Sequence, residues 1–535
     1  MKREKQFLII LLLLFYAETA FTQVMFQKTF GELSGSGNDR AFSVIQTNDG
    51  NYAFTGFTSF QSPVGAIYLV KINNVGDTLW TKIIGDTVLF RNSYGIAQTS
   101  DSGFIVSAYN ITSPNFTAFL YFIRTDASGN IVWTKNYGNI NETNIISSIQ
   151  ETHDGNFIAA GHSDSTQQRS LLLKLNQNGD TLWTRTYSGI AGSWFTDVKQ
   201  AYDSNYIVTG EVNDTLNNGR SYVSLMKVDQ NGNLLWSKMF VVLRYPIANA
   251  IELTSDGFVI AGQSTDYPTS SNHFLFLLKT DLQGNPLWCK TFSNPIGESR
   301  PISISKTLNG GFTLMGNYYD SAYATEKVLL IRTDSTADTL WTNSFTGKPA
   351  SEGESVAATS DGGNIFTGFT ADTFSIGIDH YYFNLDIYVV KTDSLGKSGC
   401  NEYPPSVTVG TYSIQTANVL LTTSSQLNQS SIGANIQSGG DVITFCISNG
   451  VDEIESSKFG FEIFPNPTEG KFTVVVGSGS INRIEIYNML GEKIYEQKIV
   501  SEKTEINLSY QRAGIYFVSV RNEKNNLATR KLVKI

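Results

Sequence analysis

Aromatic side chains suited to ligand binding collect in segments whose length varies along this 535-residue chain. Tyrosine supplies most of them, and one histidine accompanies the last pair. The residues are Tyr267, Tyr318, Tyr319, Tyr323, His380, Tyr381 and Tyr382. Aromatic rings on exposed loops stack on sugars or fill protein interfaces. The sequence therefore predicts that a glycan or a protein binds at these loops, while packing of the loops on themselves remains an alternative.

Charged residues that could support catalysis precede several of the expected strands, but they follow no recognisable pattern. The candidates are Arg91, Arg244, Glu298, Arg300 and Glu354. A retaining glycosidase needs two carboxyl groups about 5–5.5 Å apart, a condition that spacing along the chain cannot test. No catalytic motif is present. An extracellular polysaccharide hydrolase or lyase is therefore the alternative to a binding protein, and a passive surface-coat protein is a third interpretation.

Motifs for metal, nucleotide or nucleic-acid chemistry are absent from the sequence. The histidines, His153, His162, His273 and His380, form neither a His-x-His nor a His-Glu-x-x-His pair, and zinc requires three or four converging ligands. There is no EF-hand loop and no Gly-Lys-Ser/Thr phosphate loop. The net charge of −9 argues against nucleic acid as a partner, because phosphates attract a basic face. We expect no metal and no cofactor.

A tryptophan that returns every 50 to 53 residues defines the architecture that must position the loops. Its copies are Trp80, Trp133, Trp183, Trp236, Trp288 and Trp341, in contexts such as GDTLWTK, GNIVWTK and GNLLWSK. A fixed period of this size indicates one structural unit copied many times. Each copy holds four short β-like runs, and a hairpin such as QTNDGNYAFTG or ETHDGNFIAAG recurs seven times. The Asp, Asn and Gly residues of the hairpins are interpreted as turn formers.

The two ends of the array predict a ring. Six Trp-type strands follow hairpins, and a seventh copy, VMFQKTFG, precedes the first hairpin with Phe26 at the Trp position. If this strand pairs with the last repeat near Tyr388, the array closes on itself. We therefore predict an all-β protein with a seven-bladed β-propeller over residues 24–396. Each Trp is expected to fill the space between neighbouring blades, and short and variable loops are expected on opposite faces.

Residues 1–22 have the features of a secretory signal peptide. Lys2, Arg3 and Lys5 precede an apolar run over residues 7–16, and small residues near position 20 permit cleavage. An uncleaved membrane anchor is the alternative, and no transmembrane segment is expected after removal of the signal. In an exported protein, we expect Cys400 and Cys446 to form a disulfide within a Ser/Thr-rich linker over residues 397–455. Cys289 is expected to be a small buried side chain.

Residues 456–535 contain short alternating runs typical of a small β-sandwich. The distinctive residues are Pro465, Asn466, Pro467, Gly470, Gly491, Gly514, Tyr516, Lys531 and Lys534. Together they resemble the type A C-terminal sorting domain of the type IX secretion system. The resemblance implies that the secretion translocon recognises residues 461–535. It also implies that the protein is secreted or held on the outer surface of a Gram-negative bacterium, and it says nothing of what the rest of the chain does.

Overall fold

The structure is a computed structural model, and its described part is entirely β apart from turns and loops. It describes residues 23–31, 37–59, 65–85, 90–112, 117–138, 142–164, 168–188, 192–214, 220–243, 245–265, 273–293, 299–320, 325–376, 379–405, 407–412, 414–417, 422–424, 429–431, 435–437, 441–448, 461–476, 481–488, 493–498, 503–522 and 527–535. Every regular element in these ranges is a strand, which confirms the all-β prediction. The predicted signal peptide lies outside them. Within them, no helix is long and apolar enough to span a membrane.

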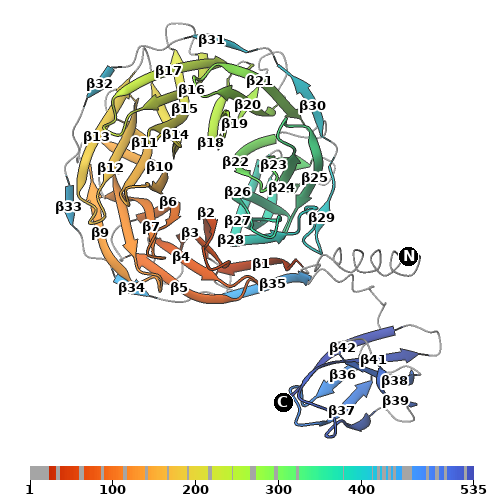
Figure 1. Cartoon of the computed structure of the whole chain (residues 1–535). Coiled ribbons are helices and arrows are strands. Elements are labelled where there is room, and N and C mark those ends of the chain that lie inside the picture. The colour runs from red at the N-terminus through yellow and green to blue at the C-terminus, as the bar shows by residue number, and fades with distance from the viewer. Residues whose placement is uncertain are drawn as a thin grey trace, which may run out of the picture. The chain divides into compact units, whose positions relative to one another are not determined.

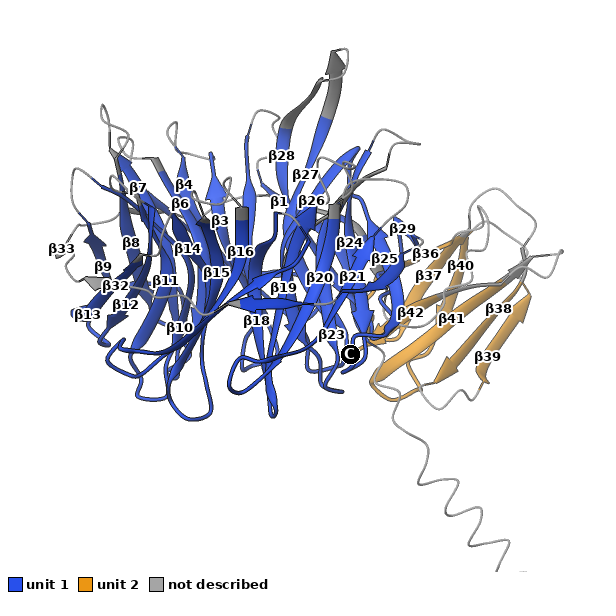
Figure 2. Cartoon of the chain, turned by 90° about the horizontal axis from the view of Figure 1, so that it is seen from above, with its two compact units in different colours: residues 1–450 blue, residues 451–535 orange. Residues whose placement is uncertain are grey.

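The chain divides into two compact units, residues 1–450 and 451–535 (Figure 2). In the first unit, the repeat of the sequence becomes a repeat of four strands that pair antiparallel in chain order. The first strands are β2 (Arg40–Gln46), β6 (Phe90–Gln98), β10 (Thr143–Glu151), β14 (Ser193–Gln200), β18 (Ile247–Thr254), β22 (Ser299–Lys306) and β26 (Ala350–Ala358). The second strands are β3 (Tyr52–Thr58), β7 (Phe104–Thr112), β11 (Phe157–Asp164), β15 (Tyr206–Asp214), β19 (Gly257–Thr265), β23 (Phe312–Asp320) and β27 (Asn364–Ile376).

The third and fourth strands complete each repeat. The third strands are β4 (Ala66–Ile72), β8 (Thr117–Thr125), β12 (Gln168–Leu175), β16 (Arg220–Val228), β20 (His273–Asp281), β24 (Thr325–Thr333) and β28 (Asp379–Thr392). The fourth strands are β5 (Thr78–Gly85), β9 (Ile131–Tyr137), β13 (Thr181–Ser188), β17 (Leu234–Val241), β21 (Pro286–Ser293) and β25 (Thr339–Phe345). A single parallel bridge, Glu326 to Ala350, joins the sheets of the last two repeats.

The N-terminal strand β1 (Met25–Gly31) takes the place of the missing seventh fourth strand. It pairs antiparallel with β28, with Thr29 opposite Tyr388, as the sequence predicts. Each first strand also contacts the first strand of the next repeat, and β26 contacts β2. Figure 1 shows the sheets of unit 1 around a common centre, with the first strands innermost.

A belt of short strands, residues 402–448, follows the outer edges of these sheets (Figure 1). Its strands are β29 (Glu402–Tyr403), β30 (Thr408–Thr411), β31 (Gln415–Ala417), β32 (Thr422–Ser424), β33 (Gln429–Ser431), β34 (Asn435–Gln437) and β35 (Asp441–Ser448). In this order they pair with β25, β21, β17, β13, β9, β5 and β1. The belt therefore visits the repeats in the reverse of chain order and ends on the N-terminal strand.

The sequence predicts an extended linker with some strand for residues 397–455, and the structure adds that its short strands pair with the outer edges of the sheets. Each outer strand offers a row of unpaired backbone groups, and a short extended segment can pair with them whatever its side chains are. The predicted disulfide between Cys400 and Cys446 is present and joins the two ends of the belt. Cys289 is free and buried, as expected, and burial raises the pKa of its thiol to about 12.

The repeating tryptophans pack against glycines of the following repeat. A Cβ added at Gly232 would lie 3.0 Å from the ring of Trp183, and one at Gly179 would lie 2.8 Å from Trp133. The indole of Trp183 also donates a hydrogen bond to the Gln230 carbonyl at 2.9 Å. The prediction that these rings fill the space between neighbouring repeats is therefore confirmed.

The hairpin aspartates are structural. In six repeats, the Asp of the turn between the first and second strands forms an ion pair with a Lys or Arg of the third strand. The pairs are Lys71–Asp49, Arg124–Asp101, Lys174–Asp154, Lys227–Asp203, Lys279–Asp256 and Lys391–Asp361. Hydrogen bonds from Thr99 and Arg124, opposed by burial, lower the pKa of Asp101 to about 2. The short turns are thus fixed by internal bonds, as their interpretation as turn formers requires.

Unit 2 is a pair of antiparallel sheets around one core. One sheet has the order β36 (Phe461–Phe464), β37 (Lys471–Val476) and β40 (Lys503–Asn507); the other has β39 (Lys493–Lys498), β38 (Ile481–Asn488), β41 (Gly514–Asn522) and β42 (Leu527–Lys534). Phe472 and Ile506 of the first sheet share a buried cluster with Ile484, Val518 and Leu532 of the second. Two sheets that share one apolar core form the small sandwich expected from the alternating sequence.

Candidate functional site

Every first strand carries a β-bulge at the same place. In β2, Ala41 faces Gly56 and Ser43 faces Thr55, so that Phe42 is an extra residue. The extra residues, called bulge residues below, are Phe42, Tyr94, Ser147, Thr196, Asn249, Ile302 and Glu354. Bulges occur frequently beside active sites, where they redirect a side chain. The first strands are therefore the natural place to look for a functional site.

Glycine opposite the bulge permits this geometry. A Cβ at Gly56 would lie 1.8 Å from the Arg40 carbonyl oxygen, and one at Gly368 would lie 1.9 Å from the Glu352 carbonyl oxygen. Gly161, Gly210 and Gly262 have equally short approaches to their partner strands. The glycine that ends most copies of the hairpin motif is thus required by the backbone rather than by a ligand.

The residue after the bulge ties neighbouring repeats together. The Ser355 hydroxyl accepts a hydrogen bond from the Val44 amide at 3.3 Å, and the Ser303 hydroxyl accepts one from the Val356 amide at 3.2 Å. Asp197 does the same with the Ile251 amide, at 3.0 Å. The bulges are therefore held by bonds across two strands, which favours a rigid site.

The bulge residues of the first two repeats, Phe42 and Tyr94, come together at the innermost strands. The rings of Phe42 and Tyr94 meet edge to face with centroids 5.2 Å apart, and Tyr94 stacks on Tyr109 at 5.6 Å. Burial raises the pKa of Tyr94, and the charges of Tyr109 and Glu354 act in the same direction. The three rings are all half-buried. They offer a partly exposed aromatic surface with an acid beside it.

Carboxyl groups and one guanidinium complete this group of residues. Burial raises the pKa of Glu354 to about 7, against the opposing charge of Arg40. Burial also raises the pKa of Glu352, to about 8, together with a hydrogen bond to Glu326 and the charges of Glu326 and Glu354. Such carboxyls can donate as well as accept a proton near neutral pH.

The guanidinium of Arg40 lies 4.4 Å from the centroid of the Phe369 ring. We call these residues the acid–aromatic cluster: Arg40, Phe42, Tyr94, Tyr109, Glu326, Glu352, Glu354 and Phe369. Arg40, Glu326 and Glu352 lie within the first three residues of β2, β24 and β26. These strand starts adjoin the loops after the second and fourth strands, which are the variable loops. The cluster thus lies at the end of the sheets to which the variable loops attach.

Some of the aromatic residues that the sequence singled out as a ligand-binding site lie in described strands, and others do not. Tyr267 and Tyr323 lie outside the described residues. Tyr318 and Tyr319 lie in β23, where Tyr319 faces Glu326 across the strand pair. His380, Tyr381 and Tyr382 lie in β28, opposite Ser375, Phe374 and Thr373. The register therefore places Tyr319 next to a member of the cluster and puts the other three on a separate hairpin.

The charged candidates divide in the same way. Glu354 belongs to the cluster. Arg91 is fully buried and donates from Nε to Asn110 at 3.0 Å, which indicates a structural role. Arg300 lies in β22, and Arg244 and Glu298 lie outside the described residues. The sequence analysis missed Arg40, Phe42, Tyr94, Tyr109, Glu326, Glu352 and Phe369. The recurring glycine of the second strand, which faces the residue before the bulge in all repeats but one, was the signal that could have found Phe42.

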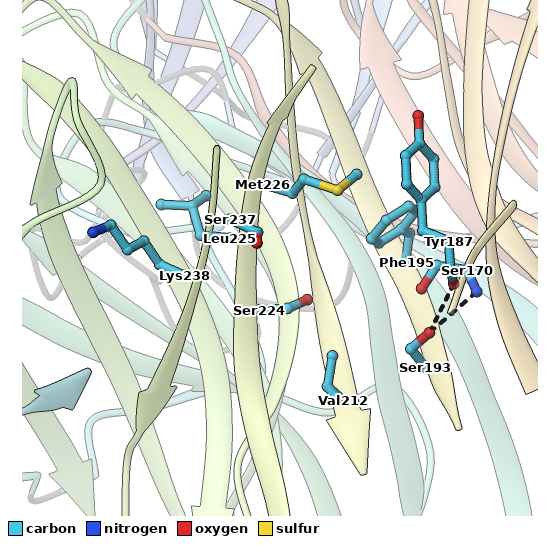
Figure 3. Close-up of a pocket in the computed structure, with 10 residues that line it drawn as sticks. All are labelled: Ser170, Tyr187, Ser193, Phe195, Val212, Ser224, Leu225, Met226, Ser237 and Lys238. Carbon is cyan, nitrogen blue, oxygen red and sulfur yellow. Dashed lines mark hydrogen bonds between the residues drawn. The ribbon is translucent and has the colours of Figure 1, made fainter. Parts of the chain in front are cut away.

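A small space lies between the third and fourth repeats and is lined by Ser170, Tyr187, Ser193, Phe195, Val212, Ser224, Leu225, Met226, Ser237 and Lys238 (Figure 3). Its volume of about 10 Å³ leaves room for about one water molecule. The Ser193 hydroxyl accepts from the Ser170 amide and donates to the Tyr187 carbonyl. This space is a packing gap between sheets. Among the described residues, no group of His, Cys, Asp or Glu side chains is arranged to hold a metal ion.

In unit 2, the Pro-Asn-Pro motif fastens the last strand of the chain. The Asn466 side chain donates to the Lys531 carbonyl at 2.7 Å and accepts from the Val533 amide at 2.9 Å. Thr468 continues this pairing with Val533 and Ile535. Asn466 therefore makes the bonds of a neighbouring strand to Lys531 and Val533 of β42.

The other predicted sorting residues lie around this edge. Gly470 has a φ of +122° and its carbonyl accepts from the Leu508 amide. Gly514 and Tyr516 lie in β41, with the Tyr516 hydroxyl donating to the Arg512 carbonyl. Lys531 and Lys534 lie in β42, and Pro465 and Pro467 flank Asn466. Gly491 lies outside the described residues.

The model of the secretion system C-terminal sorting domain matches residues 462–535. These residues belong to that family. The sorting domain makes the chain a secreted or cell-surface protein, as the resemblance implied. The chain is also 33% identical over 72 residues to the ulvan lyase NLR42 of Nonlabens ulvanivorans. That match covers 13% of this chain and 14% of the lyase, so the chain spans only a small part of that relative.

Solved structures similar to the chain are distant. A Dyadobacter fermentans protein of unknown function is 9% identical, with a TM-score of 0.41 over 69% of this chain and 99% of its own. Sqt1 from Chaetomium thermophilum is 11% identical, with a TM-score of 0.36 over 72% of this chain and 90% of its own. Similarities at this level carry no argument about fold or function.

Proposed function

We propose that the protein is an exported, seven-bladed β-propeller that binds a glycan at the end of its sheets where the variable loops lie. The propeller comprises residues 24–396 with the belt around it. Seven equivalent bulges, the pairing of β1 with β28 and the contact of β26 with β2 support this architecture. In this proposal, residues 1–22 are the signal peptide and residues 456–535 are the sorting domain, with residues 461–535 recognised by the secretion translocon.

The acid–aromatic cluster is the observation that carries the binding proposal. Sugar rings present apolar C–H faces beside hydroxyl groups, so they bind where aromatic faces alternate with polar side chains. Phe42 and Tyr94 supply the faces, and Glu354 and Arg40 supply acceptor and donor groups next to them. All four side chains are half-buried, which leaves part of each open to a ligand. A protein partner on the same surface is the competing interpretation.

Binding to a glycan array tests this proposal. The exported protein is applied in wild-type form and as Tyr94→Ala, with Tyr202→Ala as the matched control. Tyr202 is 71% exposed in the short turn between β14 and β15, at the end of the sheet away from the variable loops. We expect at least one glycan to bind the wild type and the control, and Tyr94→Ala to weaken that binding about tenfold or more. Binding that is equal in all three proteins, or absent from the wild type, would contradict the proposal.

Cleavage of a polysaccharide at the same site is a second candidate function. It is favoured by two neighbouring carboxyls whose pKa values are raised to about 7 and about 8, a range suited to general acid–base catalysis. New reducing ends or unsaturated sugars released from polysaccharides report hydrolysis or elimination. If the site is catalytic, Glu354→Gln abolishes product release while glycan binding persists. If no polysaccharide is cut, the site only binds.

A further inference from the structure

The first strands are the innermost strands of unit 1. One edge of each first strand pairs with the second strand of its repeat, and the sheet faces contact neighbouring repeats. The other edge of each first strand borders the region that the first strands surround in Figure 1. The six bulge residues whose side chains are described are all half-buried.

The bulge is also the position at which the repeats differ most in chemistry. Two residues after it, every first strand has a valine or isoleucine: Val44, Ile96, Ile149, Val198, Ile251, Ile304 and Val356. Glycine, or in one repeat alanine, stands opposite the residue before it. The bulge residues themselves run around the repeats as Phe, Tyr, Ser, Thr, Asn, Ile and Glu. A constant framework thus presents seven different side chains at one equivalent position.

Asn249 gives this position a specific indication of a ligand. Its side-chain oxygen is buried and accepts no hydrogen bond within the described part of the chain. Buried polar atoms are nearly always paired, because an unpaired one costs about 1–3 kcal/mol. Because the Asn249 side chain as a whole is half-buried, rotation of its amide would let this oxygen accept a hydrogen bond from a ligand hydroxyl. Glu354, on the other side of the aromatic pair, can accept or donate in the same way.

We propose that the bulge residues determine which glycan the protein accepts. This inference rests on the proposed glycan binding and deepens it. Phe42 and Tyr94 contact the apolar face of a sugar ring. The polar bulge residues form hydrogen bonds with the hydroxyl groups of the oligosaccharide; they are Ser147, Thr196, Asn249 and Glu354. The ligand class is a neutral or weakly charged oligosaccharide, because the side chains offer hydroxyl, amide and carboxyl groups and only one guanidinium nearby. The variable loops then contribute affinity without setting the choice of sugar.

Specificity profiles on a glycan array test this inference. The bulge variants are Asn249→Ala, Thr196→Val and Glu354→Gln, each checked for an unchanged far-ultraviolet spectrum and melting temperature. The matched loop variants are Tyr381→Ala and Tyr382→Ala. We expect the bulge variants to lose about tenfold in affinity for the preferred glycan and to change the ranking of glycans. The loop variants should weaken binding to all glycans alike.

The outcomes separate this inference from the proposal on which it depends. If the bulge variants keep the wild-type ranking while the loop variants change it, the bulge residues do not select the ligand, although glycan binding itself stands. If no glycan binds the wild-type protein, both are overturned. A bulge variant with a lower melting temperature than the wild type is replaced by a conservative one, Asn249→Asp or Thr196→Ser. The inference requires that this variant still changes the order of affinities for the glycans.

Discussion

The hydroxyl of Tyr388 donates a hydrogen bond to the side-chain oxygen of Gln27 at 2.6 Å, across 361 residues of sequence. Both side chains are buried. The Gln27 amide nitrogen donates in turn to the Ser398 hydroxyl at 2.7 Å and to the Cys400 carbonyl. One glutamine of the N-terminal strand therefore bonds to the last strand of the repeats and to the segment just before the belt.

Gln27→Leu should destabilise unit 1 substantially. The substitution removes the buried hydrogen bonds that Gln27 accepts from the Tyr388 hydroxyl and donates to the Ser398 hydroxyl, and each lost bond costs about 0.5–1.5 kcal/mol. We expect a lower urea midpoint, together with faster hydrogen exchange in β1 than in β11. Tyr202→Ala, in an exposed turn, serves as the control and should leave both unchanged. An unaltered midpoint would show that Gln27 does not fasten the strand.

Loss of the Cys400–Cys446 disulfide should loosen the belt. Its 46-residue separation corresponds to roughly 4 kcal/mol in the chain-entropy model of disulfide stabilisation. Cys446→Ser is expected to lower the melting temperature and to expose residues 402–448 to proteases. A reductant should lower the melting temperature of the wild type but not of Cys446→Ser. Equal stability of the two proteins under oxidising conditions would contradict a structural role for the bond.

Gly232→Ala tests the packing of tryptophan on the next repeat. Gly232 has a φ of +78°, and an added Cβ would meet Arg185 at 2.8 Å and Trp183 at 3.0 Å. Gly50 has the same φ of +78° with no atom within 4 Å of such a Cβ. Gly50→Ala should therefore cost only the backbone strain, about 1 kcal/mol, and Gly232→Ala about 1–3 kcal/mol more. Denaturant unfolding measures both, and equal losses would argue against the contact.

The stability of unit 1 should fall as the pH rises from about 4.5 to about 8, in part because of Glu352 and Glu354. Their pKa values are raised from 4.5 to about 8 and about 7, so the folded chain holds protons that the unfolded chain has released. Ionisation in this window therefore favours unfolding. Glu352→Gln and Glu354→Gln remove the effect. Each should be more stable than wild type at pH 8, by about 1 kcal/mol or more, and equal to it below pH 4.5. If the free energy of unfolding of each variant differs from that of the wild type by the same amount at every pH in this range, the raised pKa values of Glu352 and Glu354 are contradicted.

Much of the repeat could be read from the sequence because its signals are local. Asp-Gly turns, alternating apolar runs and the placement of Trp183 between neighbouring repeats each depend on neighbours within one repeat or the next. The pairing of Phe26 and Thr29 with the last repeat followed from counting strands. These parts of the prediction agree with the pairings in the structure.

The course of the belt and the bulges could not be predicted, for physical reasons. Strands as short as Glu402–Tyr403 pair through the backbone alone, so the side chains of the predicted extended linker do not identify the strands with which it pairs. A bulge adds one residue to a strand without changing its composition, and so Tyr94 looks like any other strand residue. Its consequence is visible only in the partner strand, where Gly56 and its equivalents avoid the displaced carbonyl. The cluster of Arg40, Glu326 and Glu352 joins repeats that are far apart in sequence, and only the three-dimensional arrangement assembles it.

The most direct test of the central claim is a crystal structure of the protein with the oligosaccharide that binds most tightly in the array. We expect a sugar ring against Tyr94 and Phe42, with hydroxyl groups directed to Glu354 and Asn249. An oligosaccharide bound at the short turns, or on the loops with Tyr94 and Glu354 left uncovered, would contradict it.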